Sequence, residues 1–194
     1  MVLLGLGVLV VILYRQLAAL MNLKAHQHQS VEDLTGGLPA GAVAPAFDYW
    51  FVNADNFRRA SWHPITNEGA ILLFGDPLCG SCERALLALG NLVTSGFFGD
   101  LECLVLTSES REVVGAVDAF RDSPVRVAHV AKEVIIDSFN LRATPYLLLV
   151  DARGTIAASG PVHDESSILQ LVRDKTITEA DAVMVAKSDH RAGR

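Results

Sequence analysis

The sequence predicts an α/β fold in which a central sheet is flanked by helices. The first indication is the apolar run Ala70–Phe74, which has the length of a buried strand and is followed by apolar residues at helical spacing from Ala85 onward. The second is the pair Thr144-Pro145, which precedes another short apolar run, Leu147–Val150. The third is the order of the predicted elements, in which strands and helices alternate and are followed by strand–strand–helix. The 194 residues suit one such domain with extensions.

Two cysteines, Cys79 and Cys82, lie where the predicted strand ends and the predicted helix begins. The first turn of a helix has unpaired N–H groups and a partial positive charge, and both stabilise a thiolate. We therefore expect Cys79 to have a lowered pKa and to be the nucleophile, with Cys82 more buried and acting as the resolving thiol. Gly80 and Ser81 are expected to tune the reduction potential, because residues between the cysteines change how the thiolate is stabilised.

Residues 1–23 predict a membrane anchor. Residues 1–14 carry no charge, and the apolar stretch resumes from Leu17 to Leu23, after Arg15. A bilayer span takes about 20 apolar residues, so the stretch is long enough when Arg15 lies at the interface. A cleaved signal peptide is the alternative. It needs a basic start and a small-x-small cleavage site, and the sequence has neither.

The rest of the chain divides into a linker, one domain and a tail. Residues 24–40 are polar and then rich in Gly, Pro and Ala, which is typical of a linker. Within them, His26 and His28 are interpreted as solvated side chains rather than metal ligands. Residues 41–174 hold the predicted strands and helices, and residues 175–194 mix charges with alanine, as a loose tail does.

Beyond the cysteine pair, apolar spacing predicts four further strands and three further helices. The predicted strands are Leu101–Thr107, Val125–Val130, Leu147–Val150 and Thr155–Ser159, and the predicted helices are residues 109–122, Lys132–Phe139 and Glu165–Val172. The last two strands flank a turn at Gly154 and are expected to pair as a hairpin.

Composition argues against several other classes of function. The formal net charge is −6, and the only charged residues before residue 31 are Arg15 and Lys24, so the domain is acidic and lacks the basic clusters of nucleic-acid-binding proteins. No nucleotide-binding glycine motif or His-Glu-x-x-His motif occurs, and no cofactor is expected. Zinc on Cys79 and Cys82 would lack a second ligand pair. Cys103 is interpreted as a buried apolar side chain, since a role as a resolving thiol would need it near Cys79.

A strand, a Cys-x-x-Cys pair, a helix and, about sixty residues later, Thr-Pro before a strand together resemble the thioredoxin fold. The resemblance covers roughly residues 40–174. It implies that Pro145 is in the cis form, packs against the disulfide and shapes a groove for the partner protein. It also implies that Thr144 offers backbone groups to an extended segment of that partner.

The sequence departs from thioredoxin itself at three positions near the cysteines. Leu78 stands where thioredoxin has tryptophan, Leu73 where it has a buried aspartate used in proton transfer, and Glu83 where it has lysine. A general cytosolic reductant is therefore disfavoured. A peroxiredoxin would need threonine three residues before the nucleophile, where this chain has Asp76, a residue that we interpret as part of a turn rather than a proton relay.

The segment Gly41–Phe47 resembles the Gly-x-x-Ala-Pro-x-Phe lead-in of the TlpA, MauD and peroxiredoxin group, which implies a β-hairpin near Asp48–Phe51 and Ala60–Trp62. The apolar N-terminus and the Asp-Pro-Leu-Cys-x-x-Cys segment are most similar to the MauD family of methylamine utilisation. MauD-like proteins are membrane-anchored, face the periplasm and are implicated in disulfide formation in methylamine dehydrogenase. The resemblance implies client thiols or disulfides, and a membrane or periplasmic redox donor or acceptor, as partners.

The expected location follows from this resemblance. Arg15 and Lys24 follow the apolar stretch, which taken alone places the domain in the cytoplasm, whereas the MauD resemblance implies an extracytoplasmic domain, the reading that we adopt. Besides a peroxiredoxin-like peroxidase, two alternatives to MauD remain. One is a TlpA/ResA-type reductant for cytochrome c or copper-site maturation. The other is a redox-silent anchored binding domain, against which the intact Cys79, Cys82 and Pro145 argue.

Overall fold

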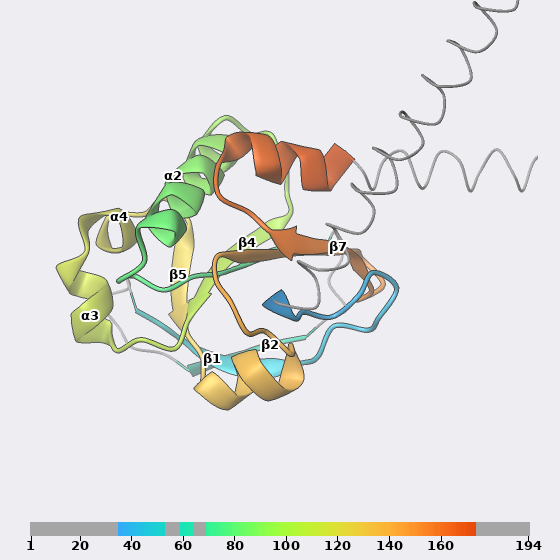
Figure 1. Cartoon of the computed structure of the whole chain (residues 1–194), viewed down its shortest axis with the longest axis horizontal. Coiled ribbons are helices and arrows are strands. Elements are labelled where there is room, and N and C mark those ends of the chain that lie inside the picture. Colours follow the sequence, from blue (N-terminus) through green and yellow to red (C-terminus); the bar gives the residue numbers. More distant parts are fainter. Residues whose placement is uncertain (1–34, 53–58, 64–68, 174–194) are drawn as a thin grey trace, which may run out of the picture. The chain divides into compact units, whose positions relative to one another are not determined.

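The computed structural model of the chain describes residues 35–52, 59–63 and 69–173 (Figure 1). Within these residues, seven strands form one mixed sheet in the order β2-β1-β5-β4-β3-β6-β7. The strands are β1 Phe47–Phe51, β2 Arg59–Trp62, β3 Ala70–Phe74, β4 Glu102–Thr107, β5 Arg126–His129, β6 Tyr146–Val150 and β7 Ile156–Pro161. The helical elements are α2 Gly80–Thr94, α3 Arg111–Ala116, α4 Asp118–Arg121, a π-helical turn Val134–Ser138 and a helix over residues 165–173.

The sheet is covered on both faces, and strand β3 lies near its middle. β3 pairs in parallel with β4 and antiparallel with β6. Because side chains alternate along a strand, Ile71 and Leu73 join an apolar cluster with α2 and the helix 165–173, whereas Leu72 and Phe74 join a second cluster with Phe139 on the other face. Figure 1 shows α2 and the helix 165–173 on one side of the sheet and the π-helical turn on the other.

The α/β class, the order of the elements and the N-terminal hairpin are confirmed. β1 and β2 pair antiparallel, with Phe47 opposite Trp62, close to the ranges that the sequence predicts. The rings of these two residues stack with their centroids 5.2 Å apart. Both side chains are buried, so the hairpin contributes apolar surface to the core rather than lying loosely beside it.

The helix predicted over residues 109–122 is wrong in one respect, because it breaks at Val117 into α3 and α4. Val117 adopts an extended backbone, with φ −108° and ψ 110°. On one continuous helix Val114 and Phe120 would point about 120° apart, since successive residues are about 100° apart. The break lets both side chains bury in the same cluster, where they are 2% and 0% exposed.

The helix predicted over Lys132–Phe139 forms with a wider turn than expected. The Phe139 N–H donates to the Val134 carbonyl, five residues back, at 3.1 Å. Phe139 is 0% exposed, and its ring contacts those of Phe47 and Phe74 at centroid distances of 5.6 and 4.8 Å. This turn therefore ties the hairpin to the strand that leads to the cysteines.

Part of the predicted domain plan falls outside the described residues. This holds for the anchor 1–23, for the linker up to residue 34 and for the tail 175–194. Among the helices that the structure does describe, none has the length and apolar character needed to cross a bilayer.

Candidate functional site

The loop between β3 and α2 is held by the side chain and backbone of Asp76. Its Oδ1 accepts a hydrogen bond from the Leu78 N–H at 2.8 Å, and its carbonyl accepts from the Cys79 N–H at 3.0 Å. This is the turn role expected of Asp76, since short polar side chains commonly bond the backbone two residues on. The loop thus delivers Cys79 to the start of α2.

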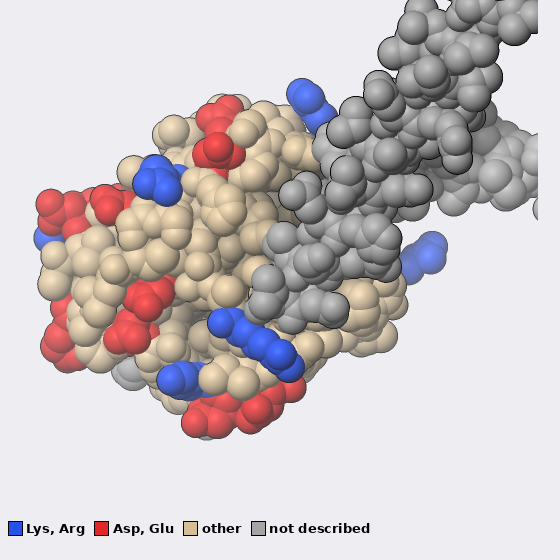
Figure 2. Space-filling view, in the orientation of Figure 1, with Lys and Arg blue, Asp and Glu red and all other residues tan. Residues whose placement is uncertain are grey.

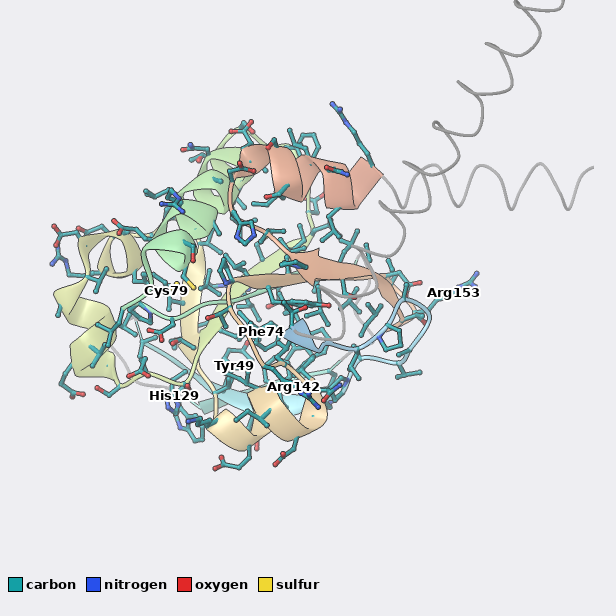
Figure 3. All side chains as sticks on the ribbon, in the orientation of Figure 1. Tyr49, Phe74, Cys79, His129, Arg142 and Arg153 are labelled. Atoms are coloured by element: carbon teal, nitrogen blue, oxygen red, sulfur yellow. The ribbon has the colours of Figure 1, made fainter. Side chains whose placement is uncertain are left out.

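Cys79 occupies the position immediately before the first turn of α2, and Figure 3 shows its sulfur beside that turn. Its carbonyl accepts hydrogen bonds from the N–H groups of Cys82 and Glu83 at 2.9 and 3.1 Å. Its side chain is partly exposed, and its Sγ lies 2.9 Å from Ser81 Oγ. The hydroxyl of Ser81 lowers the pKa of Cys79, and burial opposes this effect less strongly. Smaller contributions from Cys82 and from the backbone N–H of Ser81 lower the pKa further.

Cys82 has the opposite environment. Its side chain is 1% exposed, and this burial raises the pKa of its thiol to about 11. The backbone of Asp76 and the side chain of Thr144 form hydrogen bonds with it that oppose the rise. Both cysteines are free thiols in this structure. The pair therefore combines a partly exposed sulfur that ionises readily with a buried sulfur that holds its proton.

The Thr144-Pro145 segment lies beside this pair. Strand β6 begins at Tyr146, which pairs with Phe74 at the end of β3. Because these strands are antiparallel, the two residues before Tyr146 lie beside the loop that follows Phe74. The side chain of Thr144 acts to lower the pKa of Cys82, an effect that the sequence did not indicate. The peptide bond before Pro145 is cis, and the Pro145 side chain is buried.

Gly80 and Ser81, the residues between the cysteines, have unequal contacts. Ser81 contacts the sulfur of Cys79 directly. A side chain at Gly80 would meet no atom within 4 Å. Any direct effect of this dipeptide on the thiolate therefore comes from the Ser81 hydroxyl and from the backbone.

Cys103 lies apart from the pair. It is opposite Ile71 in the parallel β3–β4 ladder, three residues before the end of β3 and hence about 10 Å further from the cysteine loop at the strand rise. Burial raises the pKa of its thiol to about 11, and its Sγ donates to the Leu101 carbonyl at 3.6 Å. Cys103 thus packs against the core cluster as interpreted, although its side chain is partly rather than fully buried.

An exposed apolar side chain lies directly before Cys79. Leu78, which precedes it, is 74% exposed, and Leu73, at the position of the buried acid in thioredoxin, is 1% exposed. Figure 2 shows acidic and basic side chains interspersed on the visible face rather than gathered in one basic patch. In the described part of the chain, no three His, Cys, Asp or Glu side chains lie close enough to hold a metal ion.

Comparison with known proteins supports the fold. No protein-family model matches the chain, and no curated protein matches it. Among solved structures, the thioredoxin domain of a thiol-disulfide oxidoreductase from Bacteroides vulgatus has a TM-score of 0.57 and 17% identity, over 69% of this chain and 96% of that one. The chain has a thioredoxin-like fold.

Two further solved structures are similar to this chain. A thiol:disulfide interchange protein from a Bacteroides species has a TM-score of 0.56 and 17% identity, over 68% of this chain and 88% of that one. A peroxiredoxin-like protein from Aquifex aeolicus has a TM-score of 0.56 and 11% identity, over 73% and 90%. At these identities the likeness shows the fold, and the residues of the site must decide the function.

We expect Ser81→Ala to raise the pKa of Cys79. The hydroxyl bonds the sulfur directly, and its loss leaves the thiolate with fewer donors, so a smaller fraction of Cys79 is ionised at pH 7. Alkylation of the reduced protein by iodoacetamide at pH 7 should slow by about two- to fivefold, in line with the loss of one charge-assisted hydrogen bond. Gly80→Ala is the matched control, and an equal effect of both variants would contradict this role of Ser81.

Proposed function

We propose that this protein is a thiol-disulfide oxidoreductase that exchanges disulfides with client proteins. The observation that carries the proposal is the contrast within one Cys-x-x-Cys pair. Cys79 is partly exposed with a lowered pKa, whereas Cys82 is buried with a pKa raised to about 11. Disulfide exchange needs such an attacking thiolate beside a second thiol that reacts only later.

In the reducing direction, the Cys79 thiolate attacks one sulfur of a client disulfide. The client S–S bond breaks, a Cys79–client disulfide forms, and the departing client thiolate takes a proton from solvent. Cys82 then loses its proton and attacks the Cys79 sulfur, which releases the second client thiolate and leaves a Cys79–Cys82 disulfide. Two electrons pass from the protein to the client, and the reverse sequence oxidises a client dithiol.

The exposed leucine next to the pair suits a protein client. Leu78 is 74% exposed directly before Cys79, so a partner that covers the sulfur also covers this side chain. Burial of an exposed leucine contributes about 1.5–3 kcal/mol, which favours a folded or extended polypeptide over a small thiol. Pro145 and Thr144 are proposed to shape the groove, because the register of β6 places them beside the cysteine loop.

A finer proposal concerns place and pathway. The apolar residues 1–23 are proposed to anchor the protein so that its domain meets extracytoplasmic clients, with a membrane or periplasmic donor or acceptor restoring the pair. The resemblance of Gly41–Phe47 and of the cysteine segment to the MauD family supports a role in methylamine dehydrogenase maturation. A TlpA/ResA-type reductant is the alternative. A reduction potential of roughly −120 mV would favour disulfide formation, and one of roughly −270 mV or lower would favour reduction.

A peroxidase is the second candidate, since a peroxiredoxin-like protein shares the fold. Its site would need threonine at position 76. Here the Asp76 carboxylate accepts from the Leu78 N–H instead. Peroxide consumption that disappears in Cys79→Ser would favour the peroxidase over disulfide exchange.

The proposal is tested by assaying the full-length chain in both directions. We expect the reduced protein to accelerate insulin reduction by dithiothreitol, or the oxidised protein to accelerate disulfide formation in a reduced peptide, by about tenfold or more over the reagent alone. Cys103→Ser is the control and should retain the activity, because its sulfur lies away from the pair. Inactivity in both assays would instead favour a redox-silent binding domain.

A further inference from the structure

Residues 36–44, which we call the strap, run along the edge of the sheet rather than hanging free before it (Figure 1, blue). At one end Gly41 N–H donates to the Ile156 carbonyl at 2.8 Å, and the Ile156 N–H donates to the Ala42 carbonyl at 2.8 Å. The Ser159 hydroxyl donates to the Leu38 carbonyl at 2.8 Å. The strap is thus tied to β7 along its length.

The first two residues of the strap contact the segment that leads into β6. The Gly37 N–H donates to the Asn140 carbonyl at 2.8 Å, and Gly36 forms an antiparallel bridge with Leu141. A Cβ at Gly36 would lie 2.1 Å from the Asn140 carbonyl oxygen. A Cβ at Gly37 would lie 2.2 Å from the hydroxyl oxygen of Tyr146. The backbone of both glycines therefore fits where no side chain could.

These contacts hold both ends of the segment that carries Thr144. The segment starts at Asn140 and Leu141, which the strap bonds, and ends at Tyr146, which the strap contacts. Tyr146 is 2% exposed and Leu141 is 2% exposed, so both are fixed in the core. Between them, Thr144 lies beside the loop that follows Phe74 and carries the cysteines, and its side chain acts to lower the pKa of Cys82.

We propose that the Gly36-Gly37 corner of the strap is a positioning element of the redox site, which holds Thr144 against Cys82 by bracing Asn140 and Tyr146. The inference rests on the proposed function, because its consequence concerns the resolving step. Gly37 does not touch either sulfur. It acts through Tyr146, two residues from Thr144, and a displaced Thr144 leaves the buried Cys82 with one polar partner fewer as its proton departs.

The test separates the two exchange steps with the aromatic disulfide dithiobis(nitrobenzoate), on reduced full-length chain in a Cys103→Ser background. Attack by Cys79 breaks the S–S bond of the reagent and releases a first nitrothiobenzoate. Attack by Cys82 on the mixed disulfide releases the second, and the Cys82 proton passes to solvent. The two releases appear as two phases of absorbance in stopped flow, so each cysteine has its own rate.

We expect Gly37→Ala to leave the first phase within about twofold of the parent and to slow the second phase by about fivefold or more. Gly41→Ala is the matched control. Gly41 also has a positive φ, +89° against +103° at Gly37, but a Cβ there would meet nothing within 4 Å. Alanine at position 41 therefore carries a similar backbone strain to alanine at position 37, but it makes no contact with Tyr146. Both absorbance phases of Gly41→Ala should have the rates of the parent.

A second phase of Gly37→Ala within about twofold of the parent would overturn the inference. If circular dichroism shows that Gly37→Ala does not fold, Ser159→Ala is the second test. This variant removes the hydrogen bond from the Ser159 hydroxyl to the Leu38 carbonyl without adding an atom. Its second phase should slow by about threefold, and a parent-like rate would overturn the inference. Absence of a rapid first phase in the parent would be a different result, since it would contradict the proposed function itself.

Discussion

Cys82→Ser is expected to accumulate as a mixed disulfide with its client, whereas Cys79→Ser is expected to lose exchange altogether. The partly exposed Cys79 makes the first attack, and the buried Cys82 releases the client afterwards. Removal of the nucleophile should lower insulin reduction by about 100-fold or more, to the rate of the reagent alone. Non-reducing gels of Cys82→Ser mixed with an oxidised client should show a covalent adduct that dithiothreitol dissolves.

The control for both variants is Cys103→Ser, whose gel pattern and activity should match the parent. A Cys79→Ser variant that still forms the adduct through Cys82 would reverse the assignment of the two roles. Such a result would also conflict with the 1% exposure of Cys82, because a client disulfide could not reach that sulfur without opening the domain.

Phe139→Ala is expected to destabilise the domain by about 3–5 kcal/mol, the usual cost of removing a buried aromatic ring. Phe139 is 0% exposed and bridges the ring of Phe74, at the end of β3, and the ring of Phe47 in the hairpin. Its loss leaves a cavity between the hairpin and the strand that leads to Cys79. Urea unfolding followed by fluorescence gives the free energy directly.

Ile136→Ala, on the same π-helical turn, is the matched control. Ile136 is 45% exposed, so its truncation should change the free energy of unfolding by about 0.5 kcal/mol or less. A Phe139→Ala variant as stable as Ile136→Ala would mean that the turn is not part of the core, and the account of its widened geometry would then be wrong.

The strands and the place of the cysteines could be predicted from the sequence because their determinants are local. Ala70–Phe74 is apolar at every position, as a strand covered on both faces requires, and all five residues are buried. The turn after it contains Asp76 and a proline. The same local pattern marks the start of α2 directly after Cys79.

The break at Val117 could not be predicted, since the apolar spacing of residues 109–122 suits one helix. The break serves a distant requirement, the burial of Val114 and Phe120 in one cluster. Helical spacing describes which residues share a face of an isolated helix. It does not show where the surrounding core lies, and the position of the core determines the break at Val117.

Two contacts of the site join residues far apart in the chain. The resemblance implies that Thr144 acts through its backbone, whereas its side chain acts to lower the pKa of Cys82, 62 positions earlier in the numbering. Gly37 was assigned to a linker, and it packs on the hydroxyl of Tyr146. Glycines in a polar, Pro-containing stretch are typical of linkers. Gly36 and Gly37 differ from linker glycines in their positive φ and in their close approach to Asn140 and Tyr146. Both features follow from the fold, and no pattern in the neighbouring sequence indicates them.

The measurement that tests the account most directly is the pH dependence of alkylation of each cysteine in the reduced full-length protein, followed by peptide mapping. Ionisation controls the rate, so a lowered pKa shifts the rise in rate to lower pH. We expect Cys79 to react first, with a midpoint below that of an ordinary cysteine, and Cys82 and Cys103 to remain unmodified at pH 7. Equal reactivity of Cys79 and Cys82, or a Cys79 midpoint above that of an ordinary cysteine, would contradict this expectation.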